Sequence, residues 1–358
     1  MAIDSMKTSQ PTTAGFLPVR LVNINDNLGK LGIVVNPMSG RDVRRVAAKA
    51  STSSHHEKQL QVTRLVLGAL EMGASRIYLG NEPFRINERA IENLPERDRV
   101  EILQYPLTHT AKDTAVMTSK MWDAGCRTFI VLGGDGTSRI VAKNLPEAVI
   151  LPLSTGTNNV FPVFCEASIA GAAAGLIAAR RLKAENHCYR CKQLHISVNG
   201  IDTDLALIDA VLLENDSIGS LLPFAADNIR QVFLTRAEPA SVGISPIGGY
   251  LRTCRATDPF GVMVNCDTEA EESVRVPLSP GLYGDIGIID HEQMELGQSY
   301  LVKGSGILAF DGDRSIQISA SDRVEVSVRQ DGPWIIEPAR ILEIAAEHNL
   351  LTRSSDHF

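Results

Sequence analysis

The stretch of this sequence best suited to chemistry is residues 129–137, which read Phe-Ile-Val-Leu-Gly-Gly-Asp-Gly-Thr. An apolar run gives way to glycines that bracket one acid, Asp135, and a helix-like pattern follows from Ser138. A buried strand that ends in glycines before a helix presents backbone N–H groups, which form a binding site for anions. Glycine lets the backbone approach a phosphate closely because it has no Cβ. An acid in such a place is unfavourable unless it holds a metal or takes a proton, so we expect Asp135 to take part in the chemistry.

Two further polar turns follow short apolar runs in the same half of the chain. Residues 31–35 are followed by Asn-Pro-Met-Ser-Gly at 36–40, and residues 149–153 are followed by Ser-Thr-Gly-Thr-Asn-Asn at 154–159. Because ligands of open parallel sheets sit at the carboxyl ends of the strands, we expect all three turns to meet a ligand. Tight connections that bind nothing are the alternative. After the first turn, the basic residues from Arg41 to Lys49 form either a solvated helix face or, at Arg41 first, part of an anion site.

The segments around these turns alternate between strand and helix patterns. Apolar residues recur at helical spacing in residues 62–70, and Gly73 and Gly125 stand where helices should end. This alternation predicts βαβ units, and therefore an α/β domain whose parallel sheet is covered on both faces. Further strands are predicted at residues 76–79 and 100–103, and further helices at 86–94, 110–124, 138–144 and 169–177.

From residue 194 onward the sequence consists of short runs in which apolar and polar residues alternate, separated by Gly, Pro and Asp. This pattern predicts an antiparallel β-sandwich. One helix, at residues 226–234, is expected to interrupt it. A final helix opens at Pro338 and is expected to pack back on the first domain. The predicted organisation is a flexible leader at 1–28, an α/β domain at 29–185, a β-sandwich at 186–334, and a C-terminal helix and tail at 335–358.

Composition narrows the function classes. The net charge of −7 and the pI near 5.7 argue against a nucleic-acid surface, which needs basic excess. The chain has no apolar run long enough to span a bilayer. Residues 1–27 lack the pattern of a signal peptide, so we expect a cytoplasmic protein without nucleic-acid or membrane partners. Its hydrophobic content of 44% and charged content of 22% are those of a globular enzyme.

Two groups of residues have competing interpretations. Short spacings that could hold zinc separate His187, Cys188, Cys191 and His195. The segment has the pattern of a strand, however, which would divide these side chains between two faces. Packing is therefore favoured over metal binding, and no metal is assigned. The sequence Phe-Asp-Gly-Asp at residues 310–313 is either a hairpin turn or a pair of carboxylates presented to a metal or a hydroxyl.

The three turns together resemble those of a known group of phosphotransferases. The Gly-Gly-Asp-Gly-Thr turn is similar to the hallmark of the superfamily that joins NAD kinases, diacylglycerol and sphingosine kinases, and 6-phosphofructokinases. The turns at Asn36 and Gly156 are similar to further motifs of the NAD and lipid kinase branches. The likeness covers about residues 30–350 and is nearest to the acetoin-catabolism X family, an NAD-kinase-like family encoded with acetoin-degradation enzymes. It implies a nucleotide-binding α/β domain, a β-sandwich on the acceptor side, and an active site in the crevice between them.

The resemblance also implies roles for single residues. Asp135 would be the general base or the acid that organises magnesium, and Asp313 or Asp311 the base by analogy with lipid kinases. The implied cofactor is Mg²⁺ with ATP, and NAD is implied as a substrate or ligand. The residues implied to bind the nucleotide are Asn36, Pro37, Ser39, Gly40, Arg41, Gly133, Gly134, Gly136, Thr137, Thr155, Gly156, Thr157, Asn158 and Asn159. Those implied on the acceptor side are Asp209, Ser245 and Tyr250.

Two departures from the NAD kinases concern the acceptor. Their Asn-Glu pair on an early strand of the β domain corresponds here to residues 206–209, which offer only Asp209. Their later Thr-Gly-Ser-Thr-Ala-Tyr loop corresponds to Ser-Pro-Ile-Gly-Gly-Tyr at residues 245–250. Both changes weaken the expectation of NAD as acceptor and leave the phosphate turns intact.

The sequence therefore predicts an NAD-kinase-like phosphotransferase that converts ATP and NAD to ADP and NADP, with a link to acetoin catabolism. The alternatives are a kinase for another small-molecule or lipid hydroxyl, and a non-catalytic nucleotide or NAD(H) sensor. A lipid acceptor is disfavoured because the sequence has no evident basic or amphipathic membrane-binding stretch. Walker A and protein-kinase motifs are absent from the sequence, which excludes those classes. We also expect a homo-oligomer.

Overall fold

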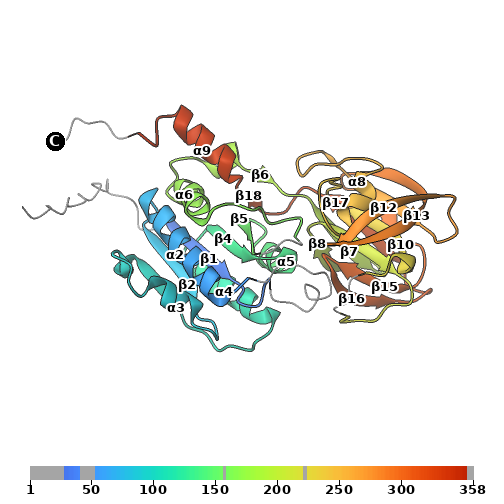
Figure 1. Cartoon of the computed structure of the whole chain (residues 1–358), viewed down its shortest axis with the longest axis horizontal. Helices are drawn as coiled ribbons and strands as arrows, with labels where there is room; N and C mark the ends of the chain where they lie inside the picture. The colour runs from blue at the N-terminus through green and yellow to red at the C-terminus, as the bar shows by residue number, and fades with distance from the viewer. Residues whose placement is uncertain (1–27, 41–52, 156–158, 221–223, 353–358) are drawn as a thin grey trace, which may run out of the picture.

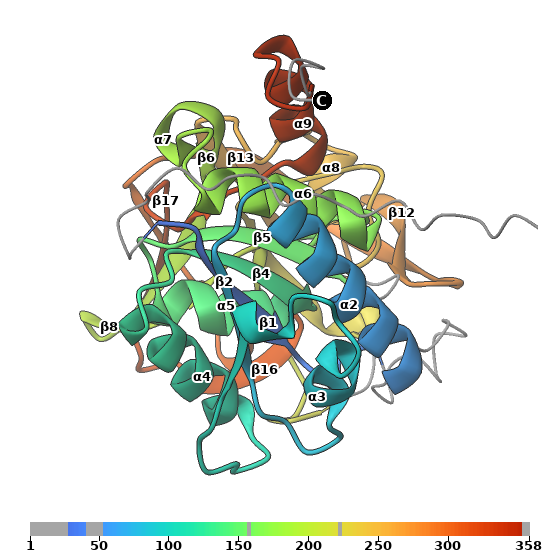
Figure 2. The ribbon, with the colours of Figure 1, turned by 90° about the vertical axis from the view of Figure 1, so that its left-hand side faces the viewer.

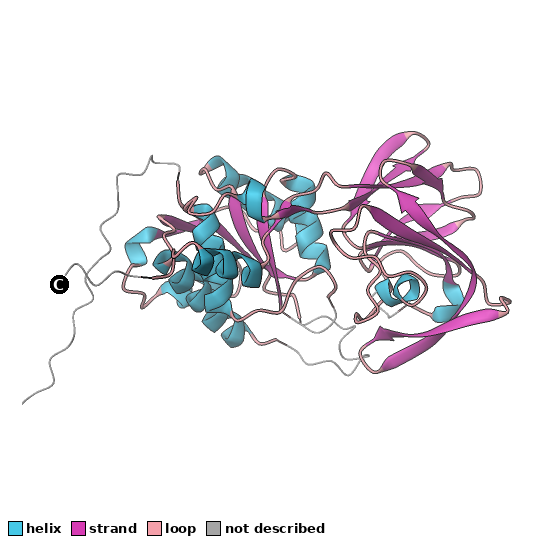
Figure 3. Ribbon diagram, turned by 90° about the horizontal axis from the view of Figure 1, so that it is seen from above, coloured by secondary structure: helices cyan, strands magenta, loops and turns pink. Residues whose placement is uncertain are grey.

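The computed structural model describes residues 28–40, 53–155, 159–220 and 224–352, and shows an α/β part beside an all-β part (Figure 1). Figure 3 shows that most of the helix lies in the first part and most of the strand in the second. Among the described residues, no helix is both long and apolar enough to cross a bilayer.

The first part is built on a seven-stranded sheet. Its strands, in spatial order, are β3 (Val100–Leu103), β2 (Arg76–Gly80), β1 (Lys30–Val35), β4 (Thr128–Gly133), β5 (Val149–Ser154), β18 (Trp334–Ile335) and β6 (Tyr189–Arg190). All neighbours are parallel except β18 and β6. The predicted parallel α/β sheet is confirmed, and the sequence order reverses between β1 and β4.

Helices cover both faces of this sheet, as Figure 2 shows. One face carries α2 (His55–Glu71), α3 (Ile86–Ile91), α6 (Ala167–Ala178), the short α7 (Ala184–His187) and α9 (Pro338–Glu347). The other carries α4 (Ala111–Asp123) and α5 (Asp135–Asn144). A 3₁₀ turn, η1 (Arg97–Arg99), precedes β3. The α5 helix begins at Asp135, not at Ser138 as expected, so the acid lies in its first turn.

The alanine-rich α6 packs closely against α2. A Cβ on Gly171 would collide with the backbone oxygen of Leu65, so only glycine permits this approach. The α9 helix packs on the same layer through Ile341, Ile344 and Ala345, which confirms the expected return of the C-terminal helix to the first part.

The second part consists of two antiparallel sheets that face each other. The larger has the order β12 (Glu272–Ser279), β13 (Leu282–Glu295), β11 (Phe260–Cys266), β10 (Ile229–Leu234), β9 (Asp209–Leu213), β15 (Gly306–Phe310) and β16 (Asp313–Ile318). The smaller has the order β14 (Ser299–Leu301), β17 (Val324–Arg329), β7 (Gln193–Val198) and β8 (Ile201–Ala206). Side chains such as Phe233, Phe310 and Val326 fill the space between them. The predicted antiparallel β-sandwich is therefore confirmed.

The helix predicted at residues 226–234 was wrong. Only a 3₁₀ turn, η2 (Ala226–Asn228), is present, and β10 follows it directly. This strand pairs with both β9 and β11, and most of its residues are buried. A central strand buried on both faces shows no alternation between apolar and polar residues, which is why its pattern resembled a helix. The one α-helix among the described residues of this part is the short α8 (Ser245–Gly249).

Candidate active site

A cavity of about 850 Å³ lies where the carboxyl ends of the first sheet meet the second part. The strands β1, β4 and β5 are neighbours in the sheet, so the polar turns that follow them come together at one edge. The opposite wall carries Asp209 and residues 311–313. The expected grouping of the three turns is confirmed for their described residues, and it places them beside the cavity.

The first turn, residues 36–40, is stabilised by the side chain of its own Asn36 and by that of Lys58. Asn36 Oδ1 accepts hydrogen bonds from the backbone N–H groups of Met38 (2.9 Å) and Ser39 (3.2 Å). The ammonium group of Lys58, from α2, lies fully buried beneath the turn. It donates to the backbone oxygens of Asn36 (2.9 Å), Pro37 (2.7 Å) and Ser39 (2.6 Å). The turn carbonyls therefore point toward a buried positive charge.

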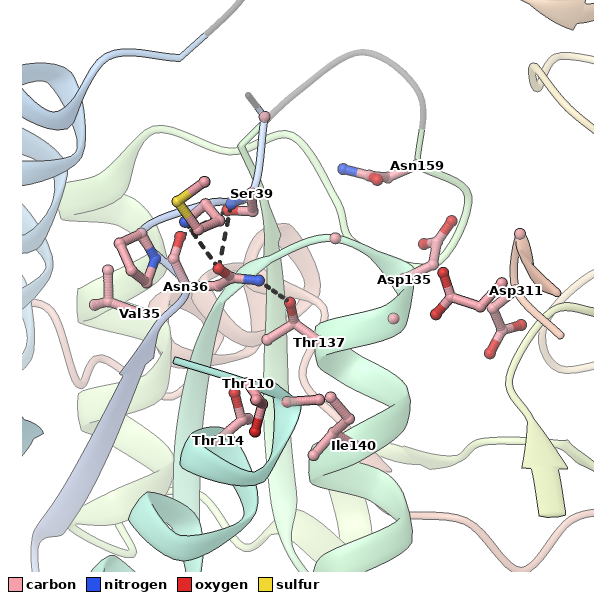
Figure 4. Close-up of a pocket in the computed structure, with 18 of the residues that line it drawn as sticks. Val35, Asn36, Ser39, Thr110, Thr114, Asp135, Thr137, Ile140, Asn159 and Asp311 are labelled. Carbon is pink, nitrogen blue, oxygen red and sulfur yellow. Dashed lines mark hydrogen bonds between the residues drawn. The ribbon is translucent and has the colours of Figure 1, made fainter. Parts of the chain in front are cut away.

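Side chains of the first turn also join it to the other two turns. Asn36 Nδ2 donates to Thr137 Oγ1 over 2.8 Å (Figure 4). Thr155 Oγ1 donates to Ser39 Oγ over 2.9 Å. The three turns are therefore one hydrogen-bonded unit.

The structure places the predicted nucleotide-binding residues in three groups. Asn36, Pro37, Ser39, Gly40, Gly134, Gly136, Thr137 and Asn159 line the cavity. Gly133 and Thr155 do not line it and support residues that do: a Cβ on Gly133 would lie 2.7 Å from the Cβ of Thr137. Arg41, Gly156, Thr157 and Asn158 lie outside the described residues.

Asp135 lies half-buried at the start of α5 and lines the cavity. Its Oδ1 accepts from the N–H of Phe161 (2.9 Å) and its Oδ2 from the N–H of Val160 (3.2 Å). Desolvation and the nearby carboxylate of Asp311 raise the pKa of Asp135 to about 7, although the two backbone hydrogen bonds act in the opposite direction. Figure 4 shows Asp135 and Asp311 close together, on elements from the two parts of the chain. Asp135 is therefore poised to exchange a proton near neutral pH.

Asp311 has a different environment, because its carboxylate is surrounded by backbone N–H groups. These belong to Leu207 (2.9 Å), Ile208 (2.8 Å) and Asp209 (3.3 Å). Asp311 and Gly312 form a two-residue hairpin turn with left-handed φ values of 47° and 86°. The hairpin interpretation of this motif is thus confirmed, and the same turn presents carboxylates to the cavity. We interpret Asp311 as a positioning residue that fixes the segment leading into β9.

Arg139 connects α5 to three acids of the second part. Its side chain is 13% exposed, and its guanidinium lies 3.2 Å from Asp313 Oδ2, 3.8 Å from Asp204 Oδ2 and 3.9 Å from Asp311 Oδ2. Because it lies four residues after Asp135, one helix positions both the candidate base and the cation that neutralises the facing acids.

Asp209 lies at the start of β9, and 6% of its surface is exposed. Its Oδ1 is buried and has no hydrogen-bond partner among the described residues. Desolvation, together with the charges of Asp311 and Asp135, raises the pKa of Asp209 well above its ordinary value. Asp209 therefore brings a buried carboxyl oxygen without a hydrogen bond to the cavity wall.

The other two residues expected on the acceptor side do not line the cavity. Ser245 is fully buried, and its hydroxyl bridges the backbone of Arg236 and Glu238. Tyr250 is 46% exposed at the end of α8. The neighbouring residues 242–244 line the wall instead.

The described residues contain no group of three or more His, Cys, Asp or Glu side chains placed to hold a metal ion. In the candidate zinc segment, Cys191 is buried and His195 Nε2 lies 3.0 Å from Asp331 Oδ1.

Comparison with known proteins divides the chain at the same place as the structure. Residues 31–181 match the ATP-NAD kinase N-terminal domain, and residues 192–331 match the acetoin catabolism protein X C-terminal domain. The chain is 30% identical over 335 residues to acetoin catabolism protein X of Cupriavidus necator, a match that covers 90% of this chain and 93% of the relative. The chain belongs to the acetoin catabolism protein X family.

This member of the acetoin catabolism protein X family also resembles a solved structure. A crystal structure of "a putative diacylglycerol kinase" from Bacillus anthracis matches 87% of this chain and 99% of its own, with 14% sequence identity and a TM-score of 0.46. Membership of the family, together with the kinase-type N-terminal domain, supports the phosphotransferase-like fold expected from the glycine turns.

Sequence reasoning missed several residues of the site of this family member. Lys58 lies in an amphipathic helix, and its position gave no sign that its ammonium group reaches the first turn. Arg139 could have been found, because it follows Asp135 by one helical turn and shares its helix face. Glu82, which lines the cavity at the end of β2, accepts hydrogen bonds from the N–H groups of Phe84 and Asn87.

Proposed function

We propose that this chain is a magnesium-dependent phosphotransferase that moves a phosphoryl group from ATP to the hydroxyl of a small acceptor. The observation that carries the proposal is the position of Asp135. It faces a cavity bordered by three linked polar turns, and its pKa is raised to about 7. A carboxylate with such a pKa can accept a proton from a hydroxyl at neutral pH.

The roles of the residues follow from their positions. Phosphoryl transfer needs positioning and charge neutralisation more than covalent chemistry from the protein. The three turns, joined through Asn36 and Ser39, would hold the phosphates at the end of the sheet. Asp135 would orient the acceptor hydroxyl and take its proton. Arg139 keeps the acids of the facing wall in place.

The acids of the cavity fit magnesium by donor chemistry. Mg²⁺ is commonly held by one or two carboxylates together with substrate phosphates. Asp313 is the first candidate ligand because its side chain is 46% exposed, and as a ligand it would share its carboxylate with Arg139, which lies 3.2 Å from its Oδ2. When bound, the ion would neutralise phosphate charge.

NAD is the first acceptor to test, because residues 31–181 match the ATP-NAD kinase N-terminal domain. The product would then be NADP. The name of the relative from Cupriavidus necator suggests acetoin catabolism as the setting.

The experiment is an assay of the pure full-length chain with Mg²⁺, ATP and NAD, and then with polyphosphate as donor, followed by detection of NADP and ADP. The matched variants are Asp135→Asn and Asp202→Asn, because Asp202 is an exposed acid on β8. We expect turnover that Asp135→Asn lowers by about 10²–10⁴-fold and Asp202→Asn leaves unchanged. Equal turnover in both variants would remove Asp135 from the chemistry.

A second candidate function is a nucleotide sensor without catalysis. It is favoured by the two backbone hydrogen bonds to Asp135, which also suit a purely structural acid. Saturable binding of ATP or NAD with no phosphorylated product from any acceptor would support it.

A further inference from the structure

The wall that faces the phosphate turns has a distinctive composition. It combines carboxylates with apolar side chains, and the described residues that line the cavity include no lysine or arginine. The lining residues of the second part are Asp209, Phe224, Val242, Gly243, Ile244, Leu278, Ser279, Asp311, Gly312 and Asp313. The described part of the acceptor side is therefore both acidic and apolar.

Two arginines among the described residues, Arg139 and Arg236, lie near the acids of the site, and both contact other groups of the protein. Arg139 lies among Asp204, Asp311 and Asp313. The guanidinium of Arg236 lies 5.2 Å from the centre of the Phe161 ring, and it is 3.8 Å from Glu238 Oε1. A phosphate or carboxylate on the acceptor would meet the acids of this wall, and like charges placed together weaken binding.

Asp209 gives the wall a specific requirement. The backbone at Asp209 is held in place because its N–H donates to Asp311 and its strand pairs with β10 and β15. Its buried Oδ1 lacks a partner among the described residues, and burying such an oxygen without a hydrogen bond is unfavourable. A ligand hydroxyl would satisfy it whether the carboxyl is ionised or protonated, because a hydroxyl can donate and accept.

The space available also limits the acceptor. Pockets for single drug-sized ligands measure about 300–1,000 Å³. A cavity of about 850 Å³ can hold a nucleotide together with a small second ligand. Val242, Ile244 and Leu278 would contact its carbon skeleton.

We propose that the preferred acceptor is a small uncharged compound with at least two hydroxyl groups, one directed to Asp135 and another bound by Asp209, and that phosphorylated compounds and dinucleotides such as NAD are less efficient acceptors than this compound. This inference rests on the proposed phosphotransfer, and it ranks such a compound above NAD as the acceptor. In the balanced reaction, the acceptor oxygen forms a bond to the terminal phosphorus of ATP and the bond from phosphorus to the bridging oxygen breaks. ADP leaves, and the hydroxyl proton passes to Asp135.

The test uses matched pairs of acceptors with the full-length chain, Mg²⁺ and ATP. In each pair an uncharged compound is compared with a charged one: glycerol with glycerol 3-phosphate, and butane-2,3-diol with NAD. The phosphorylated product is followed by ³¹P NMR, and ADP release is measured. We expect at least one uncharged diol or triol to be phosphorylated, with a kcat/KM at least about tenfold above that of its charged counterpart. Preference for NAD or for glycerol 3-phosphate would overturn this inference and keep the phosphotransferase. ATP binding without phosphorylation of glycerol or of butane-2,3-diol would also overturn it.

Asp209→Asn separates acceptor binding from fold. We expect the variant to raise the KM of the uncharged acceptor about tenfold and to leave the KM of ATP unchanged, because Asp209 lies on the wall opposite the turns. Glu292→Gln on the exposed face of β13 is the matched control and should change neither value. A parallel rise in both KM values in Asp209→Asn would show a structural role and overturn the assignment. Failure of the wild-type chain to bind ATP at all would instead refute the proposed function.

Discussion

Asn36 Nδ2 donates a hydrogen bond of 2.8 Å to Thr137 Oγ1, and this bond joins two turns that lie 101 residues apart in the sequence. The same side chain accepts from two backbone N–H groups of its own turn. One amide therefore fixes the shape of the first turn and its distance from the glycine turn.

Replacement of Asn36 by alanine should separate the two turns. We expect Asn36→Ala to weaken ATP binding about tenfold and to lower the free energy of unfolding by about 1–2 kcal/mol, because several hydrogen bonds are lost together. Isothermal titration with ATP and thermal unfolding measure the two effects. Asn186→Ala, at an exposed position in α7, is the control and should change neither. Unchanged ATP affinity in Asn36→Ala would show that the first turn does not organise the nucleotide site.

The activity should depend on the ionisation of Asp135. Its pKa is raised to about 7, and only the ionised carboxylate can accept a proton. We therefore expect log(kcat/KM) for the acceptor to fall by about one unit for each pH unit below about 7, and to level off above it. A profile that is flat between pH 5 and 8 would contradict the role of Asp135 as base.

The ionisation of Asp135 should lower the stability of the folded chain over the same pH range in which it raises the activity. Because the pKa of Asp135 is higher in the folded chain than its ordinary value of 3.8, the folded state binds more protons between about pH 4 and 7. The stabilisation from its proton is complete below that window and is lost as the pH rises through about 7. Asn cannot ionise, so the variant does not lose this stabilisation as the pH rises. The stability of Asp135→Asn, relative to the native chain, should therefore be about 1–2 kcal/mol greater at pH 8 than at pH 5. Chemical denaturation at both pH values measures this gain, and an equal offset at the two would contradict it.

Arg139 should stabilise the contact between the two parts. We expect Arg139→Gln to lower the free energy of unfolding by about 3 kcal/mol at pH 8, because the buried carboxylate of Asp311 loses its counter-ion. Its charge lowers the pKa values of Asp209 and Asp311, so the loss should be smaller at pH 5, where these acids are more protonated. Arg323→Gln removes an exposed ion pair with Glu325 and should cost less than about 0.5 kcal/mol. Equal effects of the two substitutions would contradict the buried role of Arg139.

Local patterns were sufficient for most of the fold. The apolar run before the glycine turn became β4, and the helical stripe at residues 62–70 became part of α2. The pattern failed at β10, because a strand covered on both sides has no polar face. It also placed the start of α5 at Ser138, three residues too late. The helix begins at Asp135, and the glycines around this residue are not typical of a helix.

The sequence by itself determined the side of the site that is formed by the three polar turns. Glycines and small polar residues after buried strands specify turns, and the parallel order of the strands brings those turns to one edge. Only the tertiary structure decided what faces them. Lys58 under the first turn, Arg139 among the acids and the unpaired oxygen of Asp209 are all relationships between residues far apart in the chain. The contact of Lys58 depends on how α2 packs within the α/β part, whereas the surroundings of Arg139 depend on how the two parts pack. Helical spacing can indicate which face of α5 carries Arg139, but it does not give the partners.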